Sequence, residues 1–222
     1  MPSSQHYHIS KIMDVIIHIN PMSILDIGTG FGKYGVLCRE YLELWDGRHN
    51  YSQFLRHIDG VEVFGDYITP LHKFVYNNIY ISDIIEVLDK IKSRYDLVLL
   101  IDVLEHFEKN QGENLLRKIL CKNDGVLIST PKKPSNQKDA FNNVYETHRS
   151  KWTKSDLSSF ASDLFIKDRV SHIVYLGNDE NVTRLKRKLL LKEVNKIPGM
   201  SFAINRADRL IKKVDRIKNT IS

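Results

Sequence analysis

The chain has 222 residues, of which 42% are hydrophobic, so it is long enough to bury a substantial core in one domain with an appendage. No apolar run approaches the ~20 residues of a membrane-spanning helix, and the polar start lacks the apolar core of a signal peptide, so we expect a cytoplasmic protein. Cys38 and Cys121 have no metal-site spacing and form no disulfide framework, which predicts packing thiols.

The net charge of +6 is concentrated at the end of the chain. Residues 180–222 contain 12 Lys and Arg against 4 Asp and Glu, a charge of +8, which leaves −2 on residues 1–179. We therefore divide the chain into a domain of residues 1–179, of which residues 1–22 form an N-terminal helical segment, and a basic helical tail of residues 180–222.

Apolar runs alternate with helical patterns along the first of these parts. After an expected helix at about residues 8–20, strand-like runs lie at residues 23–27, 57–64, 78–82, 95–101, 125–130, 164–170 and 172–176. Short apolar runs that alternate with helices are typical of a parallel sheet covered on both faces. Only Ser171 separates the last two runs, too little for a crossover helix, so one of them is expected to be antiparallel.

Two helices have recognisable boundaries. Thr153-Lys-Ser-Asp156 is a near capping box, which predicts a helix that begins near Lys154. An amphipathic segment opens at Gly112-Glu113 and ends at residues 123–125. Trp152, directly before the capping box, is either a core anchor for the helix or a stacking platform.

A glycine turn follows the first strand in the sequence ILDIGTGFGKYG, residues 24–35. Gly28, Gly30 and Gly32 permit positive φ and a close approach of backbone N–H groups to a ligand, and the next helix points its positive end there. Asp26 adds a negative charge, which disfavours phosphate and suits a cationic ligand such as a sulfonium amino acid. The pattern therefore indicates a nucleoside-cofactor site.

Other interpretations of this turn can be compared with the same residues. A Walker loop needs four residues between its first Gly and Gly-Lys, followed by Ser or Thr; here three residues separate Gly28 from Gly32, and no Ser or Thr follows the Gly-Lys pair. The dinucleotide fingerprint fits Gly30, Gly32 and Gly35, but it begins after the turn has started. That fingerprint and a turn that serves only tight packing stay open as alternatives.

The pattern h-h-D-h-G-x-G-x-G fits residues 24–32 without a mismatch, and here the chain resembles the class I methyltransferases that use S-adenosylmethionine. A second segment, YDLVLLIDVLEHF at residues 95–107, resembles the fourth-strand motif of the same family, and order and spacing agree from about residue 20 to 177. The resemblance implies an α/β fold with a Rossmann-like, seven-stranded, mostly parallel sheet, helices on both faces and an antiparallel final hairpin. It also implies S-adenosylmethionine as the cofactor.

Acidic residues stand at the carboxyl ends of the expected strands, where open parallel sheets bind ligands. The resemblance implies that Glu62 grips both ribose hydroxyls and that Asp102 lies at the methionine end of the cofactor. Asp59 is the rival of Glu62, three residues earlier. The insertion at about residues 45–56 lengthens the gap between the glycine turn and Glu62 beyond the usual spacing.

The adenine end of the expected cofactor site falls at ISDI, residues 81–84. Here the resemblance implies that Asp83 holds the adenine amino group and that Ile84 packs on the ring. The alternative for Asp83 is a helix N-cap.

Methyl transfer from a sulfonium is an in-line displacement that requires alignment of the acceptor and, for a hydroxyl, removal of its proton. The catalytic candidates are Asp102, His106 and His148. Together with Glu105 they resemble the metal-ligating pattern E-x-x-E-H…H of RNA 3′-terminal 2′-O-methyltransferases, which would bind Mg²⁺, Mn²⁺ or Zn²⁺, although Asp at position 102 shortens the reach. Alternatively, His106 hydrogen-bonds within its turn and His148 orients substrate or loop.

The expected acceptor is a small molecule, methylated on oxygen or nitrogen and drawn from sugars or cell-envelope precursors. The segment Pro131–His148 is the expected substrate-facing loop, in which Lys132 and Lys133 are either phosphate contacts or a solvated pair. His6, Tyr7 and His8 are either part of a lid or surface residues. A metal-dependent RNA 2′-O-methyltransferase and a non-catalytic cofactor-binding or scaffold protein are the alternatives.

The tail continues with a helix-like stretch at Arg184–Lys196, a break at Pro198-Gly199, and apolar positions at helical spacing between residues 204 and 221. Lysines and arginines stand between those apolar positions. A basic amphipathic helix of this kind is expected to lie on an anionic membrane, dock nucleic acid, or pack on its own domain or a sister subunit.

Overall fold

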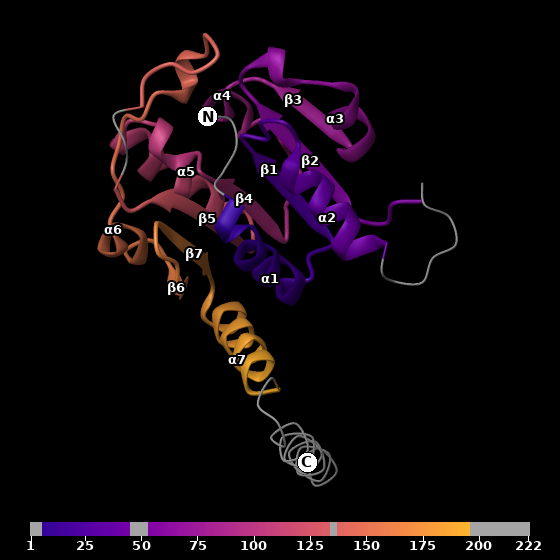
Figure 1. Ribbon diagram of the computed structural model, residues 1–222, viewed down its shortest axis with the longest axis vertical. Helices are drawn as coiled ribbons and strands as arrows, with labels where there is room; N and C mark the ends of the chain where they lie inside the picture. Colours follow the sequence, from indigo (N-terminus) through magenta and orange to yellow (C-terminus); the bar gives the residue numbers. More distant parts are fainter. Residues whose placement is uncertain (1–5, 45–52, 134–136, 196–222) are drawn as a thin grey trace, which may run out of the picture. The chain divides into compact units, whose positions relative to one another are not determined.

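The computed structural model describes residues 6–44, 53–133 and 137–195, and within them seven strands form one sheet in the order β3-β2-β1-β4-β5-β7-β6 (Figure 1). Neighbouring strands are parallel except at β7, which is antiparallel to β5 and to β6. The strands are β1 (Ser23–Ile27), β2 (His57–Glu62), β3 (Asn78–Ile81), β4 (Leu97–Ile101), β5 (Gly125–Pro131), β6 (Ser162–Ile166) and β7 (Ser171–Gly177). The predicted Rossmann-like sheet with an antiparallel final hairpin is confirmed.

Helices cover both faces of this sheet. The α-helices are α1 (Ile9–Ile19), α2 (Lys33–Glu43), α3 (Pro70–Val75), α4 (Ile84–Val87), α5 (Lys109–Lys122), α6 (Lys154–Ser158) and α7 (Asp179–Asn195). The short 3₁₀ turns are η1 (His6–His8), η2 (Gly65–Tyr67), η3 (Leu104–His106) and η4 (Val144–Glu146). The units β1-α2-β2 and β2-α3-β3 step along the sheet in the opposite direction to β4-α5-β5, so right-handed crossovers put α2 and α3 on one face and α5 on the other. Helix α1 contacts α2 and lies beside it in Figure 1.

The core beneath α4, α5 and α6 determines which way β1 presents its side chains. Leu25 and Ile27 belong to that core, together with Leu116 of α5 and Leu157 of α6. Because side chains alternate along a strand, Asp26 points to the opposite face, toward α2 and α3.

Several boundaries differ from the prediction. Strand β2 ends at Glu62, before residue 64, and β4 begins at Leu97, after residue 95. Strand β6 covers residues 162–166 instead of 164–170, because Oδ1 of Asp168 accepts the N–H groups of Val170 (2.9 Å) and Ser171 (3.0 Å) and closes a turn into β7.

The helix boundaries around Trp152 have clear physical causes. Helix α6 begins at Lys154 as predicted, with Asp156 N–H bonded to Thr153 Oγ1 (3.1 Å) and Thr153 N–H bonded to Asp156 Oδ2 (2.8 Å). Helix α5 begins before Gly112, and a Cβ at Gly112 would lie 2.6 Å from Cζ2 of Trp152. Trp152 is fully buried, so it is a core anchor for both helices.

The chain divides into two units, residues 1–182 and 183–222. The helix expected from residue 184 is present in α7 as far as Asn195. The amphipathic pattern between residues 204 and 221, and most of the expected insertion after residue 44, lie outside the described residues. None of the described helices is both long and apolar enough to cross a membrane.

Candidate active site

A cavity of about 360 Å³ lies at the carboxyl ends of the central parallel strands. Residues at the ends of β1, β2, β3 and β4 all line it, as expected for a ligand site in an open α/β sheet. Of the residues predicted for the site, it is lined by Gly28, Gly30, Glu62, Asp83, Ile84, Asp102 and His106. Asp26, Gly32, Glu105 and His148 do not line it.

The glycine turn adopts the backbone conformation that its sequence requires. Gly28, Gly30 and Gly32 have φ angles of 73°, 53° and 81°. At Gly28 a Cβ would also lie 2.5 Å from Cγ2 of Val103, which follows β4. Only glycine therefore allows the first turn residue to pack against the β4 loop in this backbone conformation.

Gly30 is held at both sides of its backbone. Its N–H donates to Oε2 of Glu62 (2.8 Å), and its carbonyl oxygen is 2.9 Å from Nε2 of His72. Because Nδ1 of His72 accepts the N–H of Thr69 (3.1 Å), the ring proton must be on Nε2, which then donates to Gly30. No motif pointed to His72, which lies on α3 and fixes the turn from 42 residues away.

Glu62 and its rival Asp59 have separate environments. Both Glu62 oxygens accept backbone N–H groups, from Gly30 and from Phe64 (3.0 Å), and burial raises the pKa of Glu62. Asp59 does not line the cavity, and its carboxylate bonds to Tyr95 Oη (2.6 Å) and His57 Nε2 (2.9 Å). Glu62 is thus the carboxylate presented by β2 to the cavity.

The expectation that Asp26 faces a cationic ligand does not fit its position. Asp26 is 3% exposed and lies outside the cavity wall, where Oδ2 accepts a hydrogen bond from Tyr76 Oη (2.6 Å). Burial raises the pKa of Asp26 to about 6, against the opposing effect of the Tyr76 bond and reinforced by the charge of Glu62. The strand alternation that points Leu25 and Ile27 toward α5 turns this side chain to the other face.

The structure is compatible with both roles considered for Asp83, the helix N-cap and the contact to adenine. Its Oδ1 accepts the N–H of Ile85 (2.9 Å) as the N-cap of α4, and the residue also lines the cavity. Ile84 is 3% exposed and lines the same wall. An acceptor and an apolar side chain therefore stand next to one another at this end.

Asp102 stands directly after β4 in a left-handed conformation, with φ of 55°. Its Oδ1 accepts a hydrogen bond from Ser129 Oγ (2.6 Å), and its Oδ2 lies 3.5 Å from Nε2 of His8. Lys33 lines the same cavity; burial lowers its pKa, and the negative charge of Asp102 acts in the opposite direction. The cavity thus presents groups of both charges at this end.

Three of the four residues considered as metal ligands come together. One ligand atom from each of Glu105, His106 and His148 lies within 4.8 Å of the others, and Asp102 is outside this group, turned toward Ser129 and His8. Within the described part of the chain, Oε2 of Glu105 is buried without a hydrogen-bond partner. Burial and the charge of Asp102 raise the pKa of Glu105 well above its usual value.

The ligand atoms of Glu105, His106 and His148 suit a transition-metal ion. Nδ1 of His106 lies 3.2 Å from the carbonyl oxygen of Thr147, which can only accept, so Nδ1 carries the proton and Nε2 keeps its lone pair. One carboxylate with two imidazoles suits Zn²⁺, Mn²⁺ or Fe²⁺ better than Mg²⁺, which prefers an all-oxygen shell. The three residues fit such an ion with open coordination positions.

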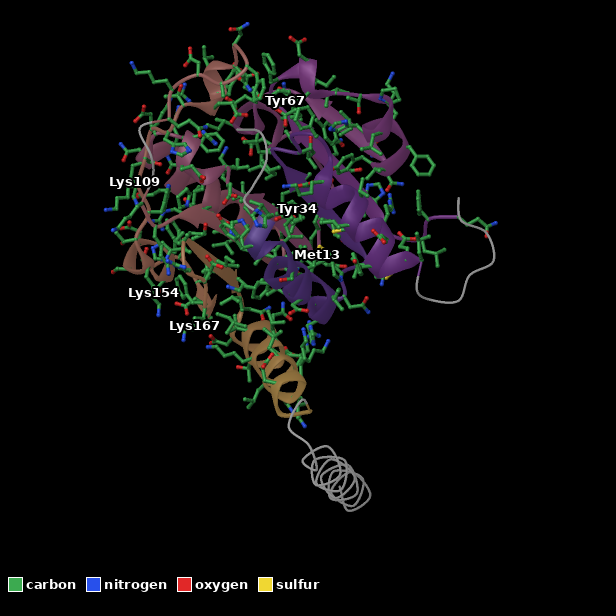
Figure 2. The ribbon with its side chains drawn as sticks, viewed as in Figure 1. Met13, Tyr34, Tyr67, Lys109, Lys154 and Lys167 are labelled. Atoms are coloured by element: carbon green, nitrogen blue, oxygen red, sulfur yellow. The ribbon has the colours of Figure 1, made fainter. Side chains whose placement is uncertain are left out.

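Several cavity residues were not predicted as site residues, and two of them are tyrosines. Tyr34, at the start of α2, and Tyr67, in η2, both line the cavity and are labelled in Figure 2. Tyr67 Oη donates to Oε1 of Glu146 (3.1 Å), which belongs to the loop after β5. Their signal is only positional, because Tyr34 follows β1 and Tyr67 follows β2.

Part of that loop enters the cavity wall, but its lysines do not. Asn143, Tyr145 and Glu146 line the cavity. Lys132 instead donates from Nζ to the carbonyl oxygen of Asp168 (2.6 Å), and neither Lys132 nor Lys133 is in the wall.

Solved structures with this architecture include a methyltransferase and a domain with SAH bound. The N-terminal domain of EvdMO1 with SAH bound covers 78% of this chain and 82% of its own, at 16% identity and a TM-score of 0.57; the same domain in the presence of SAH and D-fucose gives 0.56 at 17% identity, covering 79% of this chain and 84% of its own. A SAM-dependent methyltransferase from Archaeoglobus fulgidus covers 76% of this chain and 91% of its own, at 17% identity and a TM-score of 0.52. No protein-family model and no curated protein matches the sequence. The chain therefore has the class I methyltransferase fold.

Proposed function

We propose that this chain is an S-adenosylmethionine-dependent methyltransferase that binds its methyl donor in the cavity at the carboxyl edge of the sheet. The observation that carries the proposal is the presence of Glu62, Asp83 and Asp102, from three different strand ends, in the wall of one cavity beside the glycine turn. The cavity volume of about 360 Å³ is within the range of small-molecule sites.

The adenosine half of the donor has suitable partners at β2 and β3. Each oxygen of Glu62 accepts one backbone N–H, and a carboxylate oxygen has two lone pairs, so one lone pair on each oxygen is left for a ribose hydroxyl. Asp83 keeps Oδ2 available for the adenine amino group while Oδ1 caps α4, and Ile84 offers an apolar face to the ring.

The methionine half has complementary charges at β4 and α2. In this assignment the carboxylate of Asp102 binds the α-ammonium group and the side chain of Lys33 binds the α-carboxylate. The glycine turn brings its backbone close to the same half of the ligand, since Gly28 and Gly30 line the wall.

The acceptor in this proposal is a small molecule methylated on oxygen or nitrogen, and we favour a sugar hydroxyl. A solved structure with the same fold was determined in the presence of D-fucose, which supports a sugar. His106 lines the cavity and is the residue of this wall best suited to take a proton from the acceptor, because its Nε2 carries a free lone pair when Nδ1 bonds Thr147. The geometry required is alignment of that acceptor with the sulfonium methyl group.

Calorimetric titration tests the donor assignment. We expect wild-type protein to bind S-adenosylmethionine and S-adenosylhomocysteine and not NADH, and Glu62→Gln to weaken both interactions at least tenfold because one anionic acceptor for the ribose is lost. Glu86→Gln, which changes an exposed carboxylate on α4 outside the cavity, is the matched control and should bind like wild type. Binding of NADH without S-adenosylhomocysteine would contradict the proposal and favour a dinucleotide site.

The cluster of Glu105, His106 and His148 favours a second candidate, a metal-assisted methylation of a hydroxyl such as the 2′-hydroxyl at an RNA 3′ end. The supporting observation is the buried, unpartnered Oε2 of Glu105 within 4.8 Å of two imidazoles, among the described residues. A metal ion held there would lower the pKa of the acceptor hydroxyl.

Metal analysis separates the two candidates. If the second is correct, plasma mass spectrometry should find about one equivalent of Zn²⁺, Mn²⁺ or Fe²⁺ in the purified protein, and His148→Ala should lose it while keeping affinity for S-adenosylhomocysteine. Methyl transfer to RNA ends should then stop on addition of a chelator. Full activity in a metal-free preparation would remove this candidate.

A further inference from the structure

His8 is a buried imidazole that the site described above does not explain. It lies in η1, directly before α1, and its side chain is 0% exposed. Both ring nitrogens are buried without a hydrogen-bond partner among the described residues. A buried polar group without a partner costs folding free energy, so its retention calls for a reason other than packing.

The ring faces the carboxylate at the end of β4. Its Nε2 is 3.5 Å from Oδ2 of Asp102, slightly beyond hydrogen-bond length, while Oδ1 of Asp102 already accepts a hydrogen bond from Ser129 Oγ (2.6 Å). Asp102 is also one of four described non-glycine residues with positive φ, so its direction is set by the backbone as well. The carboxylate thus lies between Ser129 Oγ, which donates to it, and the buried His8 ring, and 20% of its side-chain surface is exposed.

We propose that His8 is a positioning residue for the methyl donor: when the donor binds, Nε2–H of His8 closes onto Oδ2 of Asp102 and orients the carboxylate toward the donor's α-ammonium group. This inference rests on the proposed function and adds to it an N-terminal residue outside the two sequence motifs. It connects η1 to the methionine end of the site, since Asp102 lines the cavity and His8 stands behind it.

The geometry supports a positioning role over direct ligand contact. His8 is not in the cavity wall, so its effect on a ligand must pass through Asp102. A carboxylate held by Ser129 on one oxygen and His8 on the other keeps one lone pair on each oxygen for the ammonium group. Without His8 or Ser129, the Asp102 carboxylate keeps its charge but its orientation is less fixed. This weakens its charge-assisted hydrogen bond to the α-ammonium group of the donor.

Two ligands that differ at the methionine end provide the test. S-adenosylhomocysteine carries the α-ammonium group, and 5′-methylthioadenosine lacks the whole amino acid part. We expect His8→Phe to raise the Kd for S-adenosylhomocysteine about tenfold, as for the loss of one hydrogen bond to a charged group, and to leave the Kd for 5′-methylthioadenosine within twofold. His6→Phe, which changes an exposed ring on the same turn, is the matched control.

Three further variants test whether His8 acts through Asp102. In an Asp102→Asn background, which keeps an acceptor and removes the charge, His8→Phe should weaken S-adenosylhomocysteine less than it does in the wild-type background. In the wild-type background, His8→Gln, whose amide can donate, should keep part of the wild-type affinity. If the Phe variant does not fold by circular dichroism, His8→Leu, a smaller apolar change, replaces it. Equal weakening of both ligands, or no effect on either, overturns the inference alone, whereas wild-type protein that does not bind S-adenosylhomocysteine overturns the proposed function and the inference with it.

Discussion

Asp26 and Glu62 are carboxylates at the ends of neighbouring strands, both buried, and their surroundings give them different roles. Glu62 bonds to backbone N–H groups of the loops that form the cavity and lines that cavity. Asp26 bonds to the hydroxyl of Tyr76 on the opposite face of the sheet, out of reach of a ligand. Asp26, although it is part of the motif, therefore makes a structural hydrogen bond, whereas Glu62 on the neighbouring strand faces the cavity.

The raised pKa of Asp26, about 6, predicts a specific pH dependence of stability. Because the folded-state pKa lies above the unfolded value, the contribution of Asp26 to stability is fully present below the unfolded pKa and is lost as pH rises through about 6. Asp26→Asn removes this loss and keeps an acceptor for Tyr76. From about pH 4.5 to about pH 7.5, urea unfolding should show wild type losing about 2 kcal/mol relative to Asp26→Asn.

That comparison contains its own control, because every other titrating group is common to the two proteins. A difference in unfolding free energy that stays constant over this pH range would mean that Asp26 is not titrating as its burial predicts.

Gly28→Ala should disturb both stability and ligand binding. The substitution puts a Cβ at φ of 73° and 2.5 Å from Cγ2 of Val103, so the turn and the β4 loop must separate. We expect a loss of about 1–3 kcal/mol in unfolding free energy, with weaker binding of S-adenosylhomocysteine because Gly28 and Val103 line the cavity.

Gly65→Ala is the matched control for that substitution. Its nearest contact would be Cγ2 of Ile81 at 3.4 Å, an ordinary van der Waals distance. Urea unfolding should separate the two variants, and equal loss at both positions would mean that neither positive φ nor the Val103 contact determines the choice of glycine at position 28.

At the scale of elements, the strands were predictable and several boundaries were not. Apolar runs bounded by turns indicate buried parallel strands, and all seven were found. The error at β6 concerns residues 167–170, three charged residues followed by a valine, which were included in the strand. The side-chain bonds of Asp168 that make them a turn leave no periodic signal. The start of α5 was missed because Gly112 looked like a boundary, and its packing on Trp152 depends on residues 40 positions apart.

Helix α6 gives a prediction at this scale. Thr153→Ala removes the oxygen that accepts the N–H of Asp156, and the loss of an N-cap of this kind costs about 1 kcal/mol. Ser155→Ala, an exposed change inside the same short helix, is the control and should shift the unfolding free energy by less than about 0.5 kcal/mol. Chemical denaturation measures both, and equal effects would show that the capping box does not stabilise α6.

At the scale of the whole molecule, the fold places residues from distant parts of the chain at one edge of the sheet. The acids at strand ends were predictable, because parallel topology gathers carboxyl ends together. The contacts of His72 and His8 were not predictable, since α3 and η1 carry no motif that indicates them. The loop that holds Glu146 was expected at the site, but its bond to Tyr67 was not. The partner of the basic tail stays a prediction.

Truncation after Asn195 tests whether the donor site is contained in the first part of the chain. All lining residues of the cavity fall between Ile27 and Arg149, so the shortened protein should bind S-adenosylhomocysteine with a Kd within twofold of wild type by calorimetry. A loss of more than tenfold in a folded truncated protein would mean that the tail takes part in donor binding.

The most direct test of the central claim is a crystal structure of the protein with S-adenosylhomocysteine. The account predicts ribose hydroxyls on Glu62, the adenine ring against Ile84 with its amino group at Asp83, and the α-ammonium group at Asp102. A ligand bound elsewhere, or bound in the cavity with its ends reversed so that adenine lies at Asp102, would contradict it.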